Sequence, residues 1–286
     1  MIKFKSLRLA LNVFWVVLSI SACQNTGDGA DSNENPIRLK GEIMASSRVT
    51  NLNLQSTRFV EGQLVGVTIA DAQSTHDNVA WMADVNGYLV NMGADVSWGI
   101  DEITVYAYHP YKAGMSTNSL FSVQTDQSTD EGYLKSDLLW AKKTAVKTDA
   151  LVTLSFAHKL TKLNVKLESD DIDDLSGATI SICGTDIATL FNSQTGELSA
   201  SVEKNIKDIK ASVTTSAAFQ ASCIIVPQTL SDGTTFIRVE HAGVTYEYKL
   251  PASFTFYEGR VYTFTITINK NNPGDVGAMV PDMPWG

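Results

Sequence analysis

Apolar and polar residues alternate most clearly in the middle of the chain, over residues 151–167, LVTLSFAHKLTKLNVKL. The first half of this stretch has its apolar residues at even positions, Val152, Leu154 and Phe156. The second half has them at odd positions, Leu163, Val165 and Leu167. Alternation predicts a strand with one buried face, and a shift by one residue turns the apolar side chains to the opposite face. We therefore expect two strands joined at a bend, the first in one core and the second in another.

A helix over the same residues is the alternative interpretation. Its apolar residues would be spaced four, three and four positions apart, at Phe156, Leu160, Leu163 and Leu167. The β-branched residues favour strands instead, at Val152, Thr153, Thr161 and Val165. We keep the two-strand interpretation. It makes the bend the boundary between two β halves, residues 37–157 and 158–286.

The alternating pattern recurs in both halves. Strands are predicted within residues 37–43, 59–70, 103–108, 178–182, 223–227, 235–240, 244–250 and 261–269. Asn86-Gly87 predicts a hairpin turn, because both residue types accept positive φ angles. Polar stretches at residues 71–78 and 110–133 predict loops. The elements together predict an all-β chain whose sheets are apolar inside and threonine-rich outside, as in a sandwich.

Residues 1–22 predict a signal peptide outside the fold. Basic residues precede an apolar run that is too short to span a bilayer comfortably. The following Ser21-Ala22-Cys23 resembles the bacterial lipoprotein signal, in which the cysteine is acylated and becomes the new N-terminus. An ordinary cleaved signal with a chance cysteine is the alternative. Acylation of Cys23 would hold the protein at the outer membrane without a spanning helix.

A polar and acidic stretch follows the cysteine and gives residues 23–36 the composition of a flexible tether. It also resembles the surface-export signal of Bacteroidetes lipoproteins. Without the signal peptide, 19 lysines and arginines face 31 aspartates and glutamates, a net charge of −12. This charge argues against nucleic acid or an anionic membrane surface as a partner. It fits a surface-exposed protein.

Two further cysteines, Cys183 and Cys223, follow Cys23. An oxidising compartment would permit a disulfide between them. Both lie beside apolar residues of predicted strands, so two buried free thiols are the alternative. Sequence does not give the distance between them, and both possibilities stay open.

No motif supports catalysis. The four histidines are scattered over loops and strand ends, at His76, His109, His158 and His241. HExxH, GxSxG, P-loop and zinc-site spacings are absent from the sequence. Four aspartates lie close together in the sequence and could indicate a calcium site: Asp170, Asp171, Asp173 and Asp174. Their spacing is not that of an EF-hand, so a solvated turn is the simpler interpretation. We expect a protein that is not an enzyme and has no metal or cofactor.

Three stretches carry a resemblance to a known family. They are SSRVTN followed by FVEGQLVGVTI, the Phe-x-His-x-Leu-x-Lys-Leu pattern at Phe156–Leu163, and FYEGRVYTFTITINK with a short tail ending near a Trp. In this order and spacing the chain resembles the fimbrillin-like proteins of Bacteroidetes, the subunits of major and minor fimbriae. The resemblance spans the whole mature chain.

The resemblance implies two transthyretin-like antiparallel β-sandwich domains in tandem, the second carrying a C-terminal tail. It also implies a structural, adhesion-related role and fimbrial subunits as partners. Such subunits are secreted as lipoproteins, and a surface protease cuts after a basic residue in the N-terminal domain. Loss of the first strand opens a groove, which a neighbour's C-terminal segment fills. An open strand edge is a strong template for such strand addition.

Carried onto this chain, the resemblance makes Ile37–Ile43 the strand that is lost. Arg48 is the preferred cleavage residue, because it lies in a polar loop between two predicted strands, and Arg58 is the second choice. Arg48 as an ordinary solvated loop charge is the alternative. The donor segment would be Val276–Trp285, and its anchors would be Val276, Met279, Val280 and Trp285. Two prolines limit its ladder hydrogen bonds, so closure of its own domain by the tail, as in a tip or anchor subunit, is the alternative.

A second function class remains open at this point. A surface glycan-binding lipoprotein of a polysaccharide-uptake system would also place β-sandwiches on a flexible tether. Exposed aromatic side chains would stack on sugars, and Trp81, Trp98 and Tyr111 are the candidates. Packing of these rings in a core is the simpler expectation.

Overall fold

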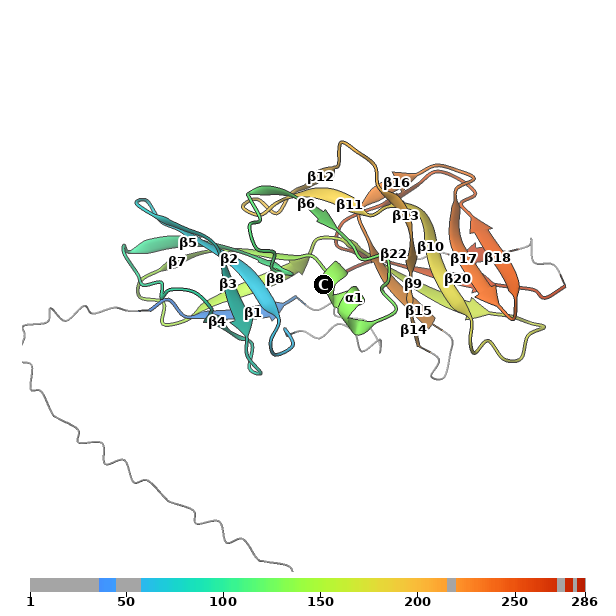
Figure 1. Ribbon diagram of the computed structural model, residues 1–286, viewed down its shortest axis with the longest axis horizontal. Coiled ribbons are helices and arrows are strands. Elements are labelled where there is room, and N and C mark those ends of the chain that lie inside the picture. Colours follow the sequence, from blue (N-terminus) through green and yellow to red (C-terminus); the bar gives the residue numbers. More distant parts are fainter. Residues whose placement is uncertain (1–35, 45–57, 215–219, 272–275, 280–281, 286) are drawn as a thin grey trace, which may run out of the picture. The chain divides into compact units, whose positions relative to one another are not determined.

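The computed structural model describes residues 36–44, 58–214, 220–271, 276–279 and 282–285 (Figure 1). Within these ranges the chain forms 22 strands and one short helix, which confirms the predicted all-β fold class. Residues from Glu34 onward form one compact unit. The signal peptide, Cys23, Arg48 and Val280 lie outside the described residues.

Seven strands of the first half pair in a closed ring. Their order is β1 (Leu39–Ile43), β4 (Tyr88–Asn91), β3 (Thr75–Ala83), β2 (Leu64–Ala70), β5 (Glu102–His109), β7 (Leu139–Val146) and β8 (Val152–His158). Every neighbouring pair is antiparallel except β1 and β8, which are parallel. The buried side chains of these strands form the first core, which includes Leu39, Val65, Val67, Val105, Leu154 and Phe156. The ring therefore closes only where β1 joins β8 to β4.

The second half contains two larger sheets around a second core. One sheet has the order β13 (Ile206–Lys210), β10 (Thr179–Asp186), β17 (Thr235–His241) and β18 (Val244–Lys249). The other has the order β14 (Ser212–Thr214), β15 (Gln220–Ile225), β9 (Thr161–Glu168) and β20 (Arg260–Thr267), with β21 (Gly277–Met279) and β22 (Asp282–Pro284) both paired to β20. Buried residues of both sheets share this core, among them Val165, Ile182, Phe236 and Phe264.

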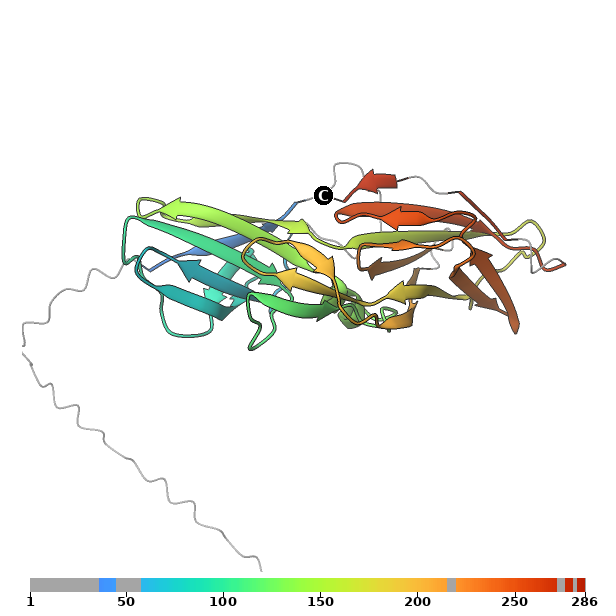
Figure 2. The same ribbon diagram turned by 90° about the horizontal axis from the view of Figure 1, so that it is seen from above.

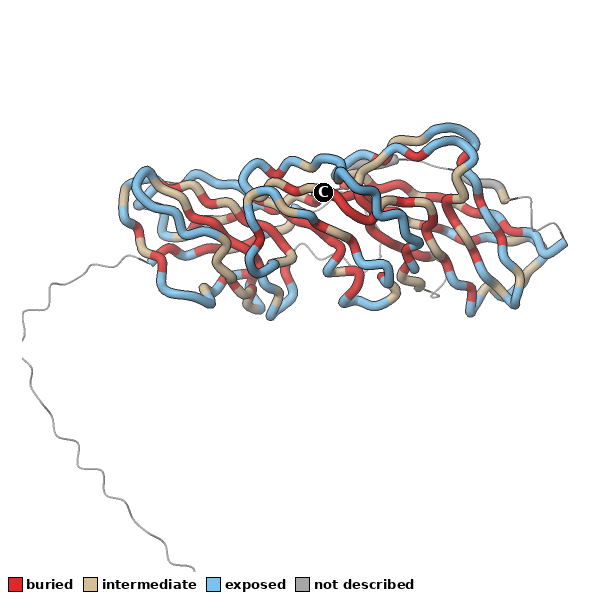
Figure 3. Tube along the Cα trace, turned by 45° about the horizontal axis from the view of Figure 1, so that its top comes forward, coloured by how far each residue is buried: buried red, intermediate tan, exposed pale blue. Residues whose placement is uncertain are grey.

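Two small sheets complete the described fold. One has the order β12 (Leu198–Ala200), β11 (Ala188–Asn192) and β6 (Asn118–Ser122), and the other pairs β16 (Gln228–Leu230) with β19 (Phe254–Phe256). Buried and exposed residues alternate along many strands of the molecule (Figure 3). β18 is an example, because Tyr246 and Tyr248 are buried while Thr245 and Glu247 are exposed. This alternation is the pattern from which the strands were predicted.

The prediction of a bend between two strands is confirmed. β8 ends at His158 and β9 begins at Thr161, so two residues separate them (Figure 2). The even apolar residues of β8 lie in the first core, and the odd ones of β9 lie in the second. The helix alternative is wrong, because both segments pair as strands over their length. One continuous stretch thus contributes a strand to each core.

The predicted loop at residues 110–133 is wrong in part. It contains β6, which pairs with β11 of the second half over five residue pairs. It also contains the start of helix α1 (Asp130–Ser136), whose N-cap residue Thr129 accepts a hydrogen bond from the Gly132 N–H at 3.1 Å. A distant partner strand and a local cap decided these elements, and neither gives the apolar alternation used for prediction.

The predicted loop at residues 71–78 is also too long, since β3 begins at Thr75. Its polar first residues pair with the end of β2, with Thr75 opposite Ala70 and His76 opposite Ile69. The Thr68 hydroxyl donates to an Asp77 carboxylate oxygen at 2.8 Å, just beside a shift in the pairing register. Polar side chains therefore form a hydrogen bond between β2 and β3 where the apolar pattern stops.

Candidate functional site

The first strand, β1, occupies a narrow place in the ring. It pairs in parallel with β8 over five residue pairs, from Leu39 opposite Val152 to Ile43 opposite Phe156. On its other side it pairs with β4 over only two. Backbone hydrogen bonds extend this attachment, including Gly41 N–H to Gly87 O at 2.9 Å and Met44 N–H to Phe156 O at 2.9 Å. We call the edges of β8 and β4, together with the buried positions that Ile37 and Leu39 occupy, the β1 seat.

Two apolar side chains fix the strand in the seat. Ile37 and Leu39 are 5% and 1% exposed, and both belong to the first core. Burial of each side chain contributes about 1.5–3 kcal/mol relative to exposure. Two buried side chains therefore supply most of the apolar attachment of this segment.

Gly41 lies at the tightest point of the seat. A Cβ atom added there would lie 2.8 Å from the Phe59 ring and 3.3 Å from the Phe156 ring. Those two rings pack edge to face, with centroids 4.9 Å apart. A glycine within a strand often marks such a close approach. Sequence analysis overlooked this glycine and Phe59, although an isolated glycine in the alternating pattern of residues 37–43 was a usable signal.

A cavity of about 430 Å³ adjoins the strand. Its lining comes from β1 with its preceding residues and from the β3–β4 region, and includes Ile37, Leu39, Trp81, Tyr88 and Leu89. Trp81 is 2% exposed, and its indole N–H has no hydrogen-bond partner among the described residues. An open groove therefore runs beside β1, with buried apolar residues at its base.

Of the two predicted cleavage residues, the structure describes only Arg58. Arg48 lies in residues 45–57, outside the described part of the chain. Arg58 is exposed, but the next residue, Phe59, is 5% exposed and packs in the first core. A cut after Arg58 would require Phe59 to leave that core.

The C-terminal segment lies on its own chain's sheet. β21 pairs with β20 from Thr265 to Thr267, and β22 pairs with β20 from Arg260 to Tyr262. Val276 is partly buried against the second core. The segment thus forms two three-residue strands, which agrees with the expectation that its prolines prevent one long regular strand.

Trp285 ends the described chain in a buried position, 6% exposed. Its ring stacks on His158 with centroids 4.1 Å apart and an interplanar angle of 8°, and its backbone N–H donates to Gly259 O at 2.6 Å. His158 Nδ1 in turn lies 2.8 Å from a carboxylate oxygen of the buried Asp137. The tail therefore reaches the bend between β8 and β9.

Buried ionisable side chains lie near the contact between Trp285 and His158. Lys162 is 2% exposed, and burial lowers its pKa to about 8, while nearby Asp137 acts in the opposite direction. Tyr133 is fully buried, its hydroxyl has no partner among the described residues, and burial raises its pKa. Sequence analysis quoted His158 and Lys162 in the pattern at Phe156–Leu163 but did not find the cluster, because its other members, Tyr133 and Asp137, lie in and beside α1, outside that pattern.

The aromatic residues predicted to stack on sugars do not suit that role. Trp81 and Trp98 are 2% and 6% exposed and belong to the first core, and Tyr111 is half-buried. Core packing was the simpler expectation for these rings, and it is confirmed for the two tryptophans.

The cysteines singled out from the sequence are buried, and Asp171 of the aspartate cluster is hydrogen-bonded within the fold. Cys183 and Cys223 are free and buried, and burial raises both pKa values, that of Cys183 to about 12. Asp171 accepts hydrogen bonds from the Lys270 N–H at 3.0 and 3.1 Å. Within the described residues no cluster of three His, Cys, Asp or Glu side chains is arranged to bind a metal, and no helix has the length and apolar character needed to cross a membrane.

Comparisons with known proteins agree on one family. The family model described as "Fimbrillin-like" matches residues 47–282. A Bacteroides uniformis protein provisionally named fimbrium subunit Fim1C is 25% identical over 228 residues, 73% of this chain and 74% of that protein. A crystal structure of a provisionally named cell adhesion protein from Bacteroides ovatus has a TM-score of 0.72 and 20% identity, and covers 88% of this chain and 98% of that one.

A second solved structure, the tip fimbrial protein Mfa3 from Porphyromonas gingivalis with a C-terminal truncation, is more distant. Its TM-score is 0.50 at 10% identity, and the match covers 87% of this chain and 99% of that one. At such identities the two structures support the fold alone.

Proposed function

This chain belongs to the fimbrillin-like family, and we propose from that premise that it is a structural subunit of a cell-surface fimbria. Its relatives are named as fimbrial and cell-adhesion proteins, and none of those names describes an enzyme. Before assembly, acylated Cys23 anchors the subunit in the outer membrane. Other fimbrial subunits and a processing protease are then its partners.

Assembly proceeds through the β1 seat. A protease cuts between β1 and β2, the first strand leaves, and a neighbour's C-terminal segment takes its place. The observation that carries this proposal is the position of β1, a five-residue strand that alone closes the ring between β4 and β8. Its loss would open the backbone edges of both neighbours and uncover the pockets of Ile37 and Leu39. Unpaired backbone groups beside an uncovered core favour capture of a new strand.

Arg48 suits the cleavage better than Arg58. A protease binds several residues on each side of the bond it cuts, and such segments must be free of the core. Phe59 follows Arg58 directly and packs against Phe156. A cut after Arg48 leaves this packing in place and still separates β1 from β2.

The donor is the C-terminal segment of another copy, with Val276, Met279, Val280 and Trp285 as its anchors. In the unassembled chain the segment lies against β20, so exchange requires it to leave that strand. One copy's tail and another copy's β1 seat are different surfaces. Repetition of such a contact produces a filament rather than a closed ring.

Limited trypsin digestion of residues 24–286 tests the proposal, followed by mass spectrometry and size-exclusion chromatography. We expect one early cut after Arg48, then a ladder of oligomers. Arg48→Ala should lose both the early cut and the ladder, while the matched control Arg58→Ala keeps both. A chain that is cut there and stays monomeric would contradict assembly through the seat and favour a terminal subunit.

A peptide with the sequence of residues 276–286 tests the donor separately. It should bind the cleaved chain, whose seat is open, and it should shorten the ladder by capping the seats. The uncleaved chain is the control, because its own strand and its own tail occupy both places. Equal binding to the cleaved and uncleaved forms would rule out the β1 seat as the peptide's site.

A further inference from the structure

A second concave surface lies in the other half of the chain, away from the β1 seat. It is a cleft of about 590 Å³. One side consists of the β11–β12 hairpin and the residues that lead to β13, and the other consists of β16, β19 and the turn after β19. Its volume is in the range of sites for small organic ligands.

The floor of the cleft is rigidly built. Gln228 fastens β16 to β10, because its side-chain oxygen accepts from the Asp186 N–H at 2.9 Å and its amide donates to Asp186 O at 3.0 Å. The Asp186 side chain holds the other wall, since its Oδ1 accepts from the N–H groups of Ala188 and Asn205 at 3.0 and 3.1 Å. A ligand would therefore meet polar groups that are already in position.

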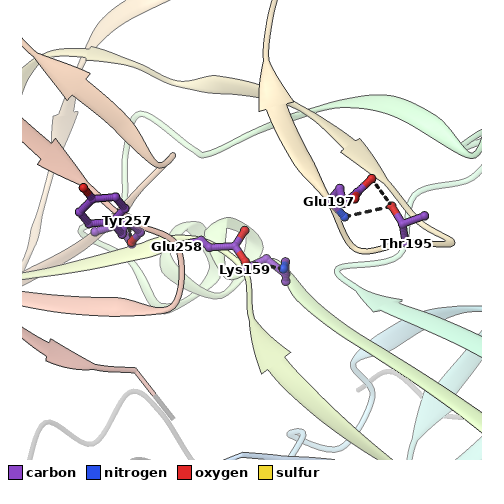
Figure 4. A network of polar contacts seen from close by, with 6 residues as sticks. Lys159, Thr195, Glu197, Tyr257 and Glu258 are labelled. Carbon is purple, nitrogen blue, oxygen red and sulfur yellow. Dashed lines mark hydrogen bonds and ion pairs between the residues drawn. The ribbon is translucent and has the colours of Figure 1, made fainter.

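An aromatic ring stands at the mouth of the cleft. Tyr257 is 60% exposed, yet its backbone is held on both sides. Its carbonyl accepts from the Thr161 hydroxyl at 2.7 Å, and its N–H donates to the Tyr262 hydroxyl at 3.3 Å. The adjacent Glu258 is held by Lys159 at 2.8 Å, and Figure 4 shows Tyr257 and Glu258 on the same turn. The backbone of both residues is thus fixed, and the two side chains leave it on different sides, that of Glu258 toward Lys159 (Figure 4).

The remaining lining offers hydrogen-bonding groups that no described residue occupies. Ser199, Ser201 and Ser231 line the cleft, the first and last of them exposed, and their hydroxyl groups form no hydrogen bond within the described part of the chain. The charged lining residues are of both signs, Asp186 and Glu258 against Lys204. This balance disfavours a strongly charged ligand. It suits a neutral ligand with many hydroxyl groups, which can donate to carboxylates and exchange hydrogen bonds with serines.

We propose that this cleft binds a neutral saccharide, with one sugar ring stacked on Tyr257 and its hydroxyl groups bonded to Glu258 and the serines. A sugar has an apolar C–H face and a polar rim, which matches an aromatic ring beside hydroxyl and carboxylate groups. The site is independent of strand exchange. It would give the subunit an adhesive contact of its own.

Saturation-transfer difference NMR on residues 24–286 tests the cleft, with glucose, galactose, mannose and N-acetylglucosamine as separate probes at millimolar concentration. At least one probe should receive saturation on its ring protons. Tyr257→Ala should weaken that binding about tenfold or more, and Glu258→Gln should weaken it less. Tyr106→Ala, which removes a half-buried tyrosine on β5 outside both the cleft and the β1 seat, should leave it unchanged.

Two further variants keep the test decisive. Tyr257→Phe retains the ring and should retain binding, and Ser199→Trp should abolish it by filling the cleft. Circular dichroism of each variant checks that the fold is kept. Absence of saturation transfer to all four sugars would overturn the proposal. So would binding that Tyr257→Ala and Ser199→Trp both leave unchanged.

Discussion

Each half of the chain begins with a strand that pairs in parallel with the last long strand of the same half, but the two first strands are attached very differently. β1 pairs with β8 over five residue pairs and with β4 over two. β9 pairs with β20 over eight and with β15 over six. β9 is also joined to β8 by only two residues. The same topological position therefore holds a strand with few pairs in one half and a strand with many in the other.

The difference follows from chain connection and neighbours rather than from apolar patterning. Both strands alternate, and both bury apolar side chains. A cut beside β1 would separate it from the rest of the fold, whereas β9 is held by the chain on both sides. We therefore expect changes in β9 to unfold the second half and changes in β1 to release one strand.

The largest effect should come from placing a charge in each strand. Val165→Asp would bury a carboxylate in the second core, where Val165 is 1% exposed, and should cost about 4 kcal/mol or more. Leu39→Asp introduces the same group at an equally buried position in β1, but the strand can leave its seat and return the charge to water. Chemical denaturation should show Val165→Asp unfolded and Leu39→Asp folded.

Leu39→Asp should also be cleaved faster between β1 and β2 than the unchanged chain. If Leu39→Asp unfolds the protein as completely as Val165→Asp does, the two strands are equally permanent. The comparison between them would then fail.

A covalent link should make β1 as permanent as β9. Lys40 and Thr153 are paired across the parallel strands and are both partly exposed, so cysteines at these positions are near enough for a disulfide. The oxidised Lys40→Cys/Thr153→Cys chain should still be cut after Arg48 but should form no ladder of oligomers. Reduction should restore the ladder. The matched control is Lys40→Cys alone, which should assemble under both conditions, and assembly of the oxidised double variant would contradict exchange at the seat.

Some elements around the site could be predicted from the sequence, and others could not. The bend, the opposite faces of β8 and β9, the first strand and the strands within residues 235–240 and 244–250 all follow from local alternation, and the structure has them. β6 and the contact of Trp285 with His158 do not follow. They depend on partners far away in the chain, β11 for the one and Asp137 with the β8–β9 bend for the other. Periodicity reports which face of a strand is buried, but it does not report which distant segment buries it.

A buried lysine further distinguishes β9. Because burial lowers the pKa of Lys162 to about 8 from 10.5, the folded chain binds fewer protons than the unfolded chain between these values. The contribution of Lys162 to stability therefore rises as the pH increases from about 8 to 10.5, and below pH 8 its charge is a cost. Lys162→Met should stabilise the protein at pH 7 by about 1–3 kcal/mol, less whatever attraction to Asp137 is lost.

Denaturant titrations at pH 7 and pH 10 check this, with the difference between the variant and the unchanged chain as the quantity of interest. That difference removes the titration of Cys183 and Cys223, whose raised pKa values lower stability at high pH in both proteins. The advantage of Lys162→Met should shrink at pH 10. An advantage that is constant with pH, or absent at pH 7, would show that Asp137 compensates the buried charge fully.

The change that is most specific to the seat is made at Gly41. Gly41→Ala places a methyl group 2.8 Å from the Phe59 ring, so β1 or the ring must shift, at a cost of about 1–3 kcal/mol. The cost falls on the attachment of β1 and not on the pairing of the other six strands with one another, so thermal stability should fall slightly while tryptic release of β1 becomes faster. Gly99→Ala is the matched control, because its added Cβ would lie 3.5 Å from its nearest neighbour, an ordinary contact. Equal release rates in the two variants would mean that Phe59 yields without loosening the strand. The five backbone pairs with β8, rather than the packing of Gly41, would then determine how firmly β1 is held.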